Sequence, residues 1–269
     1  MHGVNNRQVK LSRGRFLGGC SGCNGTLCIR GVKQDFDAWG LPGWSGDEVF
    51  ACMRKAETFH PKTWFQDSAK DHGYSGPLHT EPHDPAPISQ LILASFISAG
   101  LPLVPDMFST GDTAHGCGHV PRTVYEGVRT TSADFVTNGF QRKNVTVLTG
   151  CTVDKVLVDS QSGQLRATGV VVQHGSATSQ TYNARQEVIL SSGAYCSPAI
   201  LLRSGIGPSN ELQKHGIPRV LELSGVGKNL LDHPVFHPLY DSPKQNKTKK
   251  KRDANWVIDC LYVLLNRPP

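Results

Sequence analysis

Hydrophobic and polar residues follow a strand-like pattern most clearly in the second half of the chain. Four short segments rich in β-branched residues lie there between turn residues, namely NVTVLTG (144–150), VDKVLVD (153–159), ATGVVVQ (167–173) and EVILSSG (187–193). Runs of this length and composition, bounded by Gly, Asn, Asp and Ser, are typical of β-strands. The pattern therefore predicts a strand-dense region between residues 144 and 193.

A period of three to four residues predicts helices in the first half. The segment WSGDEVFACMRKAETF (44–59) has an apolar face and begins with Ser45 and Glu48, the pair that forms a capping box. A second helix is predicted for ISQLILASFISAG (88–100), ending at Gly100. Between them, residues 60–87 are rich in Pro, Gly and His and predict a long irregular segment. A polar helical turn is predicted near residues 132–138.

A strand, a glycine turn and a helix follow one another after residue 187. The strand ends at Gly193, Ser197 and Pro198 predict a helix start as N-cap and first helical residue, and Gly205 predicts its end. This order presents a helix N-terminus at the carboxyl edge of a sheet, where anionic ligands bind. A short helix, SNELQKHG (209–216), comes next. Together the elements predict an α/β fold that is an α+β mixture.

The stretch GRFLGGCSGCNGTLCIRG (14–31) could hold a phosphate, hold a metal ion or form only a turn. No GxxxxGK[ST] phosphate loop occurs in the chain. A structural zinc site usually pairs two CxxC knuckles, and Cys20-x-x-Cys23 has no second such pair. The string His115-Gly-Cys-Gly-His119 offers nitrogen and sulfur ligands, but its glycines favour an ordinary loop. We therefore expect no metal site, and free thiols for the eight cysteines.

Other catalytic patterns are missing from the sequence. None of the three GxG triplets has the third glycine that a dinucleotide fingerprint needs, and no GxSxG nucleophile elbow occurs. The paired carboxylates Asp35 and Asp37 flank Phe36 and fit a solvated loop. The residues alone thus leave the role of the glycine-rich stretch open.

Three stretches resemble the glucose-methanol-choline (GMC) family of flavin oxidoreductases. The first is GRFLGGCSGCNGTLCIRG continued by KQDFDAWGLPGWS (33–45), which is similar to the first family signature. The second, GAYCSPAILLRSGIG (193–207), is similar to the second signature, and GVGKNLLDHP (225–234) to a further family string. The resemblance implies a GMC oxidoreductase N-terminal, FAD-binding region over residues 1–240, with part of the antiparallel substrate-domain sheet.

The resemblance also implies a cofactor site. The loop Gly18–Leu27 would lie against the flavin of FAD, and the backbone of Val153 would meet the adenine. The residues at matching cofactor-contact positions are Gly19, Cys20, Asn24, Gly25, Thr26, Leu27 and Val153. In some relatives the position of Cys23 holds a histidine bound covalently to flavin, so with cysteine here we expect non-covalent FAD.

The chain departs from the family at both ends. Family members begin with a βαβ unit bearing the glycine fingerprint and end with a catalytic histidine paired with a second His or Asn. We expect this chain to lack both, and His233 and His237 match no catalytic position. The resemblance therefore implies a segment of an FAD-dependent enzyme that oxidises the CH–OH group of a small alcohol, and we expect the segment to have no catalytic residue of its own. The alternative is a catalytically inactive truncated fragment or pseudoenzyme.

Charge and hydropathy change this picture little. Six of the basic residues lie in KQNKTKKKR (244–252), and the rest of the chain is nearly neutral, so we expect no nucleic-acid partner. Residues 241–269 fit the family poorly and are expected to form an atypical basic tail without order. No apolar run is long enough to predict a membrane span, and the first residues do not form a signal peptide. A secretory signal of a longer precursor would lie upstream of Met1, so the sequence does not determine the compartment. It does not determine the oligomeric state either.

Overall fold

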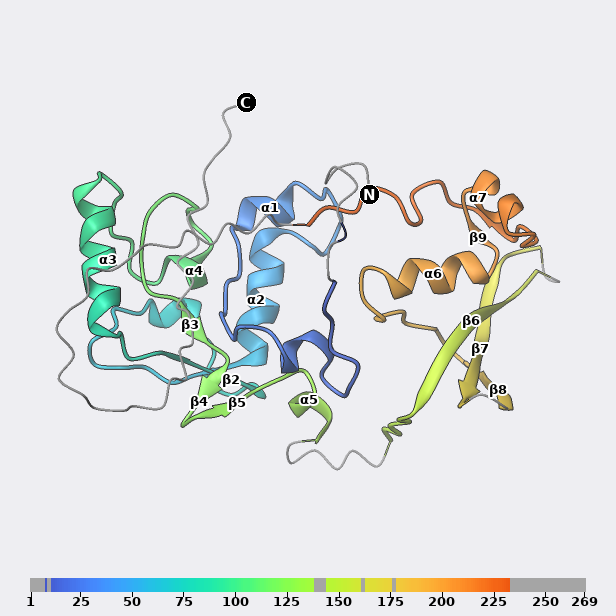
Figure 1. Ribbon diagram of the computed structural model, residues 1–269, viewed down its shortest axis with the longest axis horizontal. Coiled ribbons are helices and arrows are strands. Elements are labelled where there is room, and N and C mark those ends of the chain that lie inside the picture. The colour runs from blue at the N-terminus through green and yellow to red at the C-terminus, as the bar shows by residue number, and fades with distance from the viewer. Residues whose placement is uncertain (1–7, 9–10, 138–143, 161–162, 176–177, 233–269) are drawn as a thin grey trace. The chain divides into compact units, whose positions relative to one another are not determined.

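The computed structural model describes residues 8, 11–137, 144–160, 163–175 and 178–232. The described chain forms two compact units, one ending at Thr146 and the other beginning at Val147 (Figure 1). Each unit has its own buried apolar residues, such as Phe50 in the first and Leu212 in the second. The predicted tail over residues 241–269, like His233 and His237, lies outside the described residues.

The first unit is built from short helices and short strands. Its helices are α1 (Lys33–Asp37), α2 (Gly46–Ala56), α3 (Pro87–Ser98), α4 (Met107–Thr110) and α5 (Asp134–Thr137), with 3-10 turns η2 (Gly19–Gly22) and η3 (Ala69–Asp71). Its strands are β1 (Glu57–Phe59), β2 (Leu78–Pro82), β3 (Pro121–Arg122), β4 (Val124–Tyr125) and β5 (Val128–Arg129).

Helix α2 begins with the predicted capping box. The Oγ of Ser45 accepts the N–H of Glu48 at 3.4 Å, and the Glu48 carboxylate accepts the N–H of Ser45 at 3.0 Å. Both bonds satisfy N–H groups that a helix start leaves without intrahelical partners. The helix buries Phe50 completely, so the predicted apolar face is confirmed.

Helix α3 is also confirmed. It begins at Pro87, a residue whose fixed φ and missing N–H suit the first helical position, and it ends two residues before Gly100. Gly100 has a φ of +95°, a conformation that glycine adopts without strain.

The three-stranded sheet of the first unit is mixed. Strand β1 pairs parallel with β2, and β2 pairs antiparallel with β3. Strand β2 falls within residues 60–87, so the irregular segment predicted there is wrong at Leu78–Pro82. The pairing partners of β2 are remote in sequence, and its pattern is interrupted by His and Pro, which hides the strand from local analysis.

The second unit contains an antiparallel sheet of β6 (Cys151–Asp159), β7 (Arg166–His174) and β8 (Thr178–Asn183), in that order. The first two were predicted, whereas β8, with its sequence TSQTYN, was not. The segments 144–150 and 187–193 do not form strands, which corrects the prediction. A strand needs hydrogen bonds to a neighbour, and within the described residues neither segment has a paired strand; Ile189 is 76% exposed.

The remaining elements of the second unit are α6 (Cys196–Arg203), β9 (Ile206–Gly207), α7 (Ser209–Lys214) and β10 (Leu221–Glu222), with β9 and β10 parallel. Helix α6 starts at Cys196, so the predicted cap is wrong: Ser197 lies in the first turn and accepts the N–H of Ser192 at 2.9 Å. The predicted end is confirmed by Gly205, at a φ of +77°.

The buried hydroxyl of Ser204 joins the end of α6 to β6. It accepts the N–H of Val156 at 2.8 Å and donates to the carbonyl of Ile200 at 2.6 Å. Parallel and antiparallel pairing thus occur together with helices, which confirms the predicted mixed α/β fold. Within the described residues, none of the helices has the length and apolar character that crossing a bilayer requires.

Candidate functional site

The glycine-rich stretch forms a compact loop in the first unit. Gly18 and Gly19 have φ angles of +95° and +51°, and the N–H of Gly19 donates to the carbonyl of Phe16 at 2.9 Å. Two consecutive left-handed residues turn the chain sharply into η2, and only glycine does so at little cost. The cluster of glycines at this point is therefore required by the backbone.

Arg129, at the end of β5, holds the loop from one side. Its Nη1 donates to the side-chain oxygen of Asn24 at 2.8 Å and to the carbonyl of Ser21 at 3.1 Å. Its Nη2 donates to the carbonyl of Asn24 at 2.9 Å. Arg129 is positioned by the β4–β5 hairpin. The turn residues of this hairpin, Glu126 and Gly127, have φ angles of +49° and +77°. Such a two-residue turn matches the twist of the paired strands.

Ser132 holds the same loop at its first turn. Its N–H donates to the Oγ of Ser21 at 3.0 Å, and its own hydroxyl donates to the carbonyl of Gly18 at 3.0 Å. Together with Arg129, this serine fixes the loop by side-chain contacts more than 100 residues away in sequence.

The loop ends at Thr26, which is buried and has a φ of +66°. Its N–H donates to the side-chain oxygen of Asn24 at 3.0 Å, and its carbonyl accepts the N–H of Thr123 at 2.8 Å. Leu27 then bridges Arg122 in β3, in antiparallel pairing. The chain therefore leaves the loop by joining the edge of the mixed sheet.

Gly25 is a glycine that the packing of the chain itself does not require. Its φ is not in the left-handed region, and a Cβ placed on it would meet no heavy atom within 4 Å. Gly14, by contrast, is crowded, since a Cβ there would lie 2.3 Å from the carbonyl oxygen of Gly19. An open glycine backbone allows a ligand to approach closely. The open backbone at Gly25 therefore leaves room for a group to lie against the loop.

The structure brings six of the seven expected contact residues together. These are Gly19, Cys20, Asn24, Gly25, Thr26 and Leu27, all in the loop. Val153 belongs to the second unit, where it lies on β6 opposite Val172 beside a register shift. Its carbonyl lies 3.5 Å from Nη2 of Arg203.

The cysteines of the loop do not gather around one point. The Sγ of Cys23 contacts the carbonyl of Cys20 at 3.7 Å, and both side chains are exposed. Burial, and then the charge of Glu57, raise the pKa of the Cys28 thiol to about 11, which keeps it protonated at neutral pH. Among the described residues, no group of three His, Cys, Asp or Glu side chains is placed to hold a metal ion.

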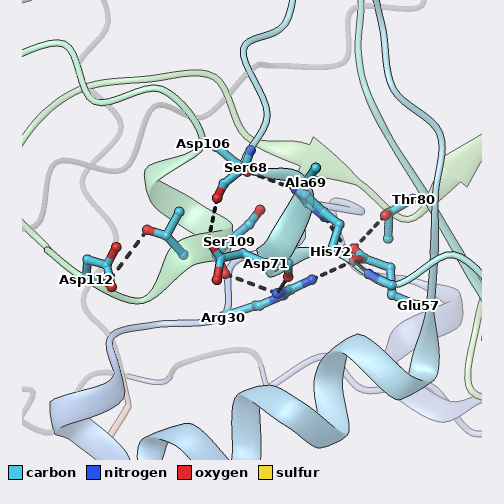
Figure 2. Close-up of polar contacts among 12 residues, drawn as sticks. Arg30, Glu57, Ser68, Ala69, Asp71, His72, Thr80, Asp106, Ser109 and Asp112 are labelled. Carbon is cyan, nitrogen blue, oxygen red and sulfur yellow. Dashed lines mark hydrogen bonds and ion pairs between the residues drawn. The ribbon is translucent and has the colours of Figure 1, made fainter.

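A buried charged network anchors the chain just after the loop (Figure 2). The Nη2 of Arg30 donates to Oε2 of Glu57 at 2.7 Å, and its Nη1 donates to the carbonyls of Asp71 at 2.6 Å and Ser109 at 3.1 Å. All these partners come from segments distant in sequence. Because Arg30 follows Thr26 by four residues, its anchorage in the core fixes the exit of the loop.

His72 connects the two carboxylates of this network. Its Nδ1 lies 2.9 Å from Oε2 of Glu57, its Nε2 lies 2.9 Å from Oδ2 of Asp106, and its ring stacks on Phe59 with centroids 3.6 Å apart. Burial acts to lower the pKa of His72, but the hydrogen bonds to Asp106 and Glu57 outweigh it and raise the pKa to about 9. His72 is therefore an imidazolium that donates from both nitrogens.

Glu57 shows the complementary shift. Burial acts to raise its pKa, but the hydrogen bond from His72, the charge of Arg30 and the hydroxyl of Thr80 together lower it to about 2. Two cations thus neutralise Glu57 and Asp106 in a site with almost no solvent exposure. One oxygen stays unsatisfied, since Oδ1 of Asp106 is buried and has no hydrogen-bond partner within the described residues.

This network leaves no pattern in the sequence from which it could be predicted. Its members are spread over nearly 80 residues, and each type is common on protein surfaces. The local signal that could have indicated a buried charge is a charged residue within a segment predicted to be ordered. Glu57, near the end of the predicted helix, is such a residue.

A cavity of about 530 Å³ adjoins the network in the first unit. Its walls are mostly apolar and aromatic, with Trp64, Phe65, Leu93 and Leu103 among them, and Asp106 also lines it. A cavity of this size and character is within the range that holds small organic molecules.

The chain thus combines a mixed α/β fold with a glycine loop that Arg129 holds in place and whose backbone is open to close approach at Gly25. The profile of the GMC oxidoreductase family matches residues 1–235, and the chain belongs to that family. Members of this family depend on FAD.

Three similar proteins illustrate the family. The chain is 39% identical over 248 residues to oxygen-dependent choline dehydrogenase from Yersinia pseudotuberculosis, covering 88% of this chain and 41% of that protein. It is 36% identical over 236 residues to the chloroplastic fatty acid photodecarboxylase of Chlamydomonas reinhardtii, covering 85% and 38%.

Among solved structures, a formate oxidase from Aspergillus oryzae, a variant made to study FAD modification, matches with a TM-score of 0.73. The two are 30% identical, and the match covers 82% of this chain and 38% of the other. The chain therefore spans about two fifths of the length of these relatives.

Proposed function

We propose that this chain is a segment of an FAD-dependent oxidoreductase that acts on the CH–OH group of a small alcohol. The observation that carries the proposal is the loop around Gly25, which is open to close approach and is fixed in place by Arg129. Membership of the GMC oxidoreductase family supports the redox chemistry. When bound, FAD would supply the acceptor for the hydride taken from the alcohol carbon.

In this proposal each part of the loop has a role towards the cofactor. Gly25 and Gly19 leave their backbone accessible, because a Cβ at either position would meet no protein atom. Asn24 presents a side chain whose orientation Arg129 fixes, and Cys20, Thr26 and Leu27 complete the contact surface. In the second unit, Val153 would meet the adenine through its backbone.

We further propose that FAD is bound without a covalent link. The position that carries a flavin-linked histidine in some relatives is Cys23 here, an exposed thiol whose Sγ contacts only the carbonyl of Cys20 within the described residues. The FAD modification studied in the formate oxidase makes the state of the flavin worth testing directly.

The proposed substrate class rests on the relatives. One relative is a choline dehydrogenase and another a fatty acid photodecarboxylase, so their names cover an alcohol and a carboxylic acid substrate. We favour the alcohol, because the identity to the choline dehydrogenase is 39% over 248 residues, against 36% over 236 residues for the photodecarboxylase. We also propose residues 1–240 as the FAD-binding region and residues 241–269 as a separate basic tail.

A second candidate is a chain that binds FAD but does not turn over substrate, or an inactive fragment or pseudoenzyme. The chain covers 41% of the length of the choline dehydrogenase relative. No catalytic residue is assigned within the chain in either proposal.

The test begins with the purified chain, titrated with FAD and followed by flavin fluorescence and visible absorbance. We expect saturable binding, release of all flavin on denaturation and filtration, and no turnover on a panel of choline, benzyl alcohol and short primary alcohols. Flavin that stays with the denatured protein would contradict the non-covalent link, and no binding at all would contradict the cofactor proposal. Turnover by this chain alone would exclude the second candidate and would also contradict the proposal that the chain has no catalytic residue of its own.

A further inference from the structure

A cysteine, a histidine and a tyrosine form a hydrogen-bonded chain on the antiparallel sheet of the second unit. Cys151 in β6 and His174 in β7 are directly opposite each other in the strand register, and Sγ lies 3.2 Å from Nδ1. The other ring nitrogen, Nε2, lies 3.3 Å from the hydroxyl of Tyr182 in β8. None of these residues belongs to the cofactor loop.

Tyr182 determines which nitrogen of His174 carries the proton. Its hydroxyl donates to the side-chain oxygen of Gln180 at 3.1 Å, so its oxygen is left to accept a hydrogen bond. Nε2 of His174 then donates to Tyr182, and the lone pair of Nδ1 faces Sγ of Cys151. A base positioned by a third group beside a thiol is the arrangement that activates nucleophilic cysteines.

We propose that Cys151 is a nucleophilic thiol, with His174 as its general base and Tyr182 as the positioning residue, and that it is the preferred site of oxidation by hydroperoxides. Cys151 and His174 are half-buried, so part of each side chain is open to a small oxidant. The carbonyl of Thr149, 3.2 Å from Sγ, is a second acceptor for the thiol proton and competes with Nδ1.

The step balances with the hydroperoxide as oxidant. The thiol proton passes to Nδ1 of His174 while Sγ attacks the distal peroxide oxygen; an S–O bond forms and the O–O bond breaks. The departing oxygen takes the proton back from His174, so Cys–SH and HOOH give Cys–SOH and water. The sulfur loses two electrons and the peroxide gains them.

The experiment compares two thiols within the same molecule. Cys52 lies in α2 and is exposed, whereas Cys151 is half-buried, so exposure alone would make Cys52 the faster of the two. The purified chain is treated with limiting iodoacetamide, and the alkylation rates of both cysteines are measured by peptide mass spectrometry. We expect Cys151 to react at least about tenfold faster than Cys52.

His174→Asn removes the base, and we expect it to lower the ratio of the two rates to one or less. Local unfolding in this variant would raise the rate at Cys151, so loss of structure cannot imitate the expected fall. Tyr182→Phe keeps the ring and removes the hydroxyl, and should give an intermediate ratio. A wild-type ratio of one or less, or an unchanged ratio in His174→Asn, would overturn the proposal.

A second arm uses hydrogen peroxide with dimedone, which traps sulfenic acid. We expect the first dimedone adduct at Cys151 and its loss in Cys151→Ser, with Cys52 labelled later. Labelling that begins at Cys52, or at random among the exposed cysteines, would overturn the oxidation site even if the iodoacetamide ratio were high.

Discussion

The guanidinium of Arg129 donates two hydrogen bonds to Asn24, from Nη1 to the side-chain oxygen at 2.8 Å and from Nη2 to the backbone carbonyl at 2.9 Å. This planar two-point contact joins the β4–β5 hairpin to the loop proposed to receive the flavin. It also holds Asn24 in the orientation that accepts the N–H of Thr26 at 3.0 Å. The geometry of the loop thus depends on a residue about a hundred positions further along the chain.

Replacing Arg129 by Lys should loosen the loop without removing the charge. A lysine is a point donor and cannot keep both contacts to Asn24, so one or two hydrogen bonds worth about 1 kcal/mol each are lost. We expect amide hydrogen exchange over residues 20–26 to become roughly tenfold faster, with weaker FAD binding. Unchanged exchange in this variant would show that the loop holds its shape without Arg129.

Gly25→Ala should separate cofactor binding from folding. Because the added Cβ meets no protein atom and the φ is ordinary, the free energy of unfolding should change by less than about 0.5 kcal/mol. FAD affinity should fall at least about tenfold, since a methyl group would occupy the approach to the loop. Fluorescence titration with FAD and urea unfolding measure the two quantities.

The matched control for this substitution is Gly14→Ala. Its Cβ would lie 2.3 Å from the carbonyl of Gly19, so we expect a loss of about 1–3 kcal/mol in stability. For Gly25→Ala, an FAD affinity equal to that of the wild type would show that the cofactor does not lie against this loop.

Glu57→Gln should strongly destabilise the first unit. The substitution keeps the shape but leaves Arg30 and His72 buried beside a neutral group, for which a cost of about 3–5 kcal/mol is typical. Thr80→Val, which removes only the hydroxyl that contacts Glu57, should cost about 1 kcal/mol. Urea unfolding of both variants tests the difference, and equal losses would mean that the ion pairs add nothing beyond one hydrogen bond.

The stability of the chain should depend on pH through the titration of His72 and Glu57. The pKa of His72 is raised from 6.5 to about 9, so its contribution is complete below pH 6.5 and is lost as pH rises through 9. The pKa of Glu57 is lowered from 4.5 to about 2, so its contribution is complete above pH 4.5 and is lost as pH falls through 2. The contact between His72 and Glu57 contributes to both shifts, so their free energies do not simply add.

We therefore expect a stability plateau between pH 4.5 and 6.5 and an alkaline decline that ends near pH 9. The decline corresponds to roughly 3 kcal/mol at most. Thermal unfolding across this range measures it, and His72→Gln serves as the control, because its alkaline decline should disappear. An identical decline in that variant would assign the effect to another group.

Ser204→Ala should destabilise the second unit through one unpaired group. The buried N–H of Val156 loses its acceptor, which costs about 1–3 kcal/mol. The hydroxyl of Ser197 accepts the N–H of Ser192, which is exposed and can bond to water instead. Ser197→Ala should therefore cost less than about 0.5 kcal/mol. Unfolding curves of the two variants, monitored by circular dichroism, give the comparison.

Much of the helical structure could be predicted because its causes are local. The capping box of Ser45 and Glu48 lies within one turn, and the ends of α3 and α6 are marked by Gly100 and Gly205. The same holds for the long strands β6 and β7, whose β-branched residues are dense enough to indicate a strand. The glycine loop was also found from sequence, because residues 14–31 are rich in glycine along a contiguous stretch.

Strand pairing depends on segments that are distant in sequence. Residues 187–190 have strand composition but no paired neighbour among the described residues, whereas β2 and β8 have poor composition and well-placed partners. A strand is defined by hydrogen bonds to another segment, so its own sequence indicates only half of the interaction.

By itself, then, the sequence determined the family, the mixed α/β class, the capped start of α2 and the glycine loop, since each depends on neighbouring residues or on a contiguous motif. Only the tertiary structure decided that Arg129 fixes Asn24, that Arg30, Glu57, His72 and Asp106 neutralise one another, and that His174 lies between Cys151 and Tyr182. These relationships join residues that are far apart along the chain, and side-chain charge and hydrogen bonding act through space, so only the folded chain brings the partners within reach of each other.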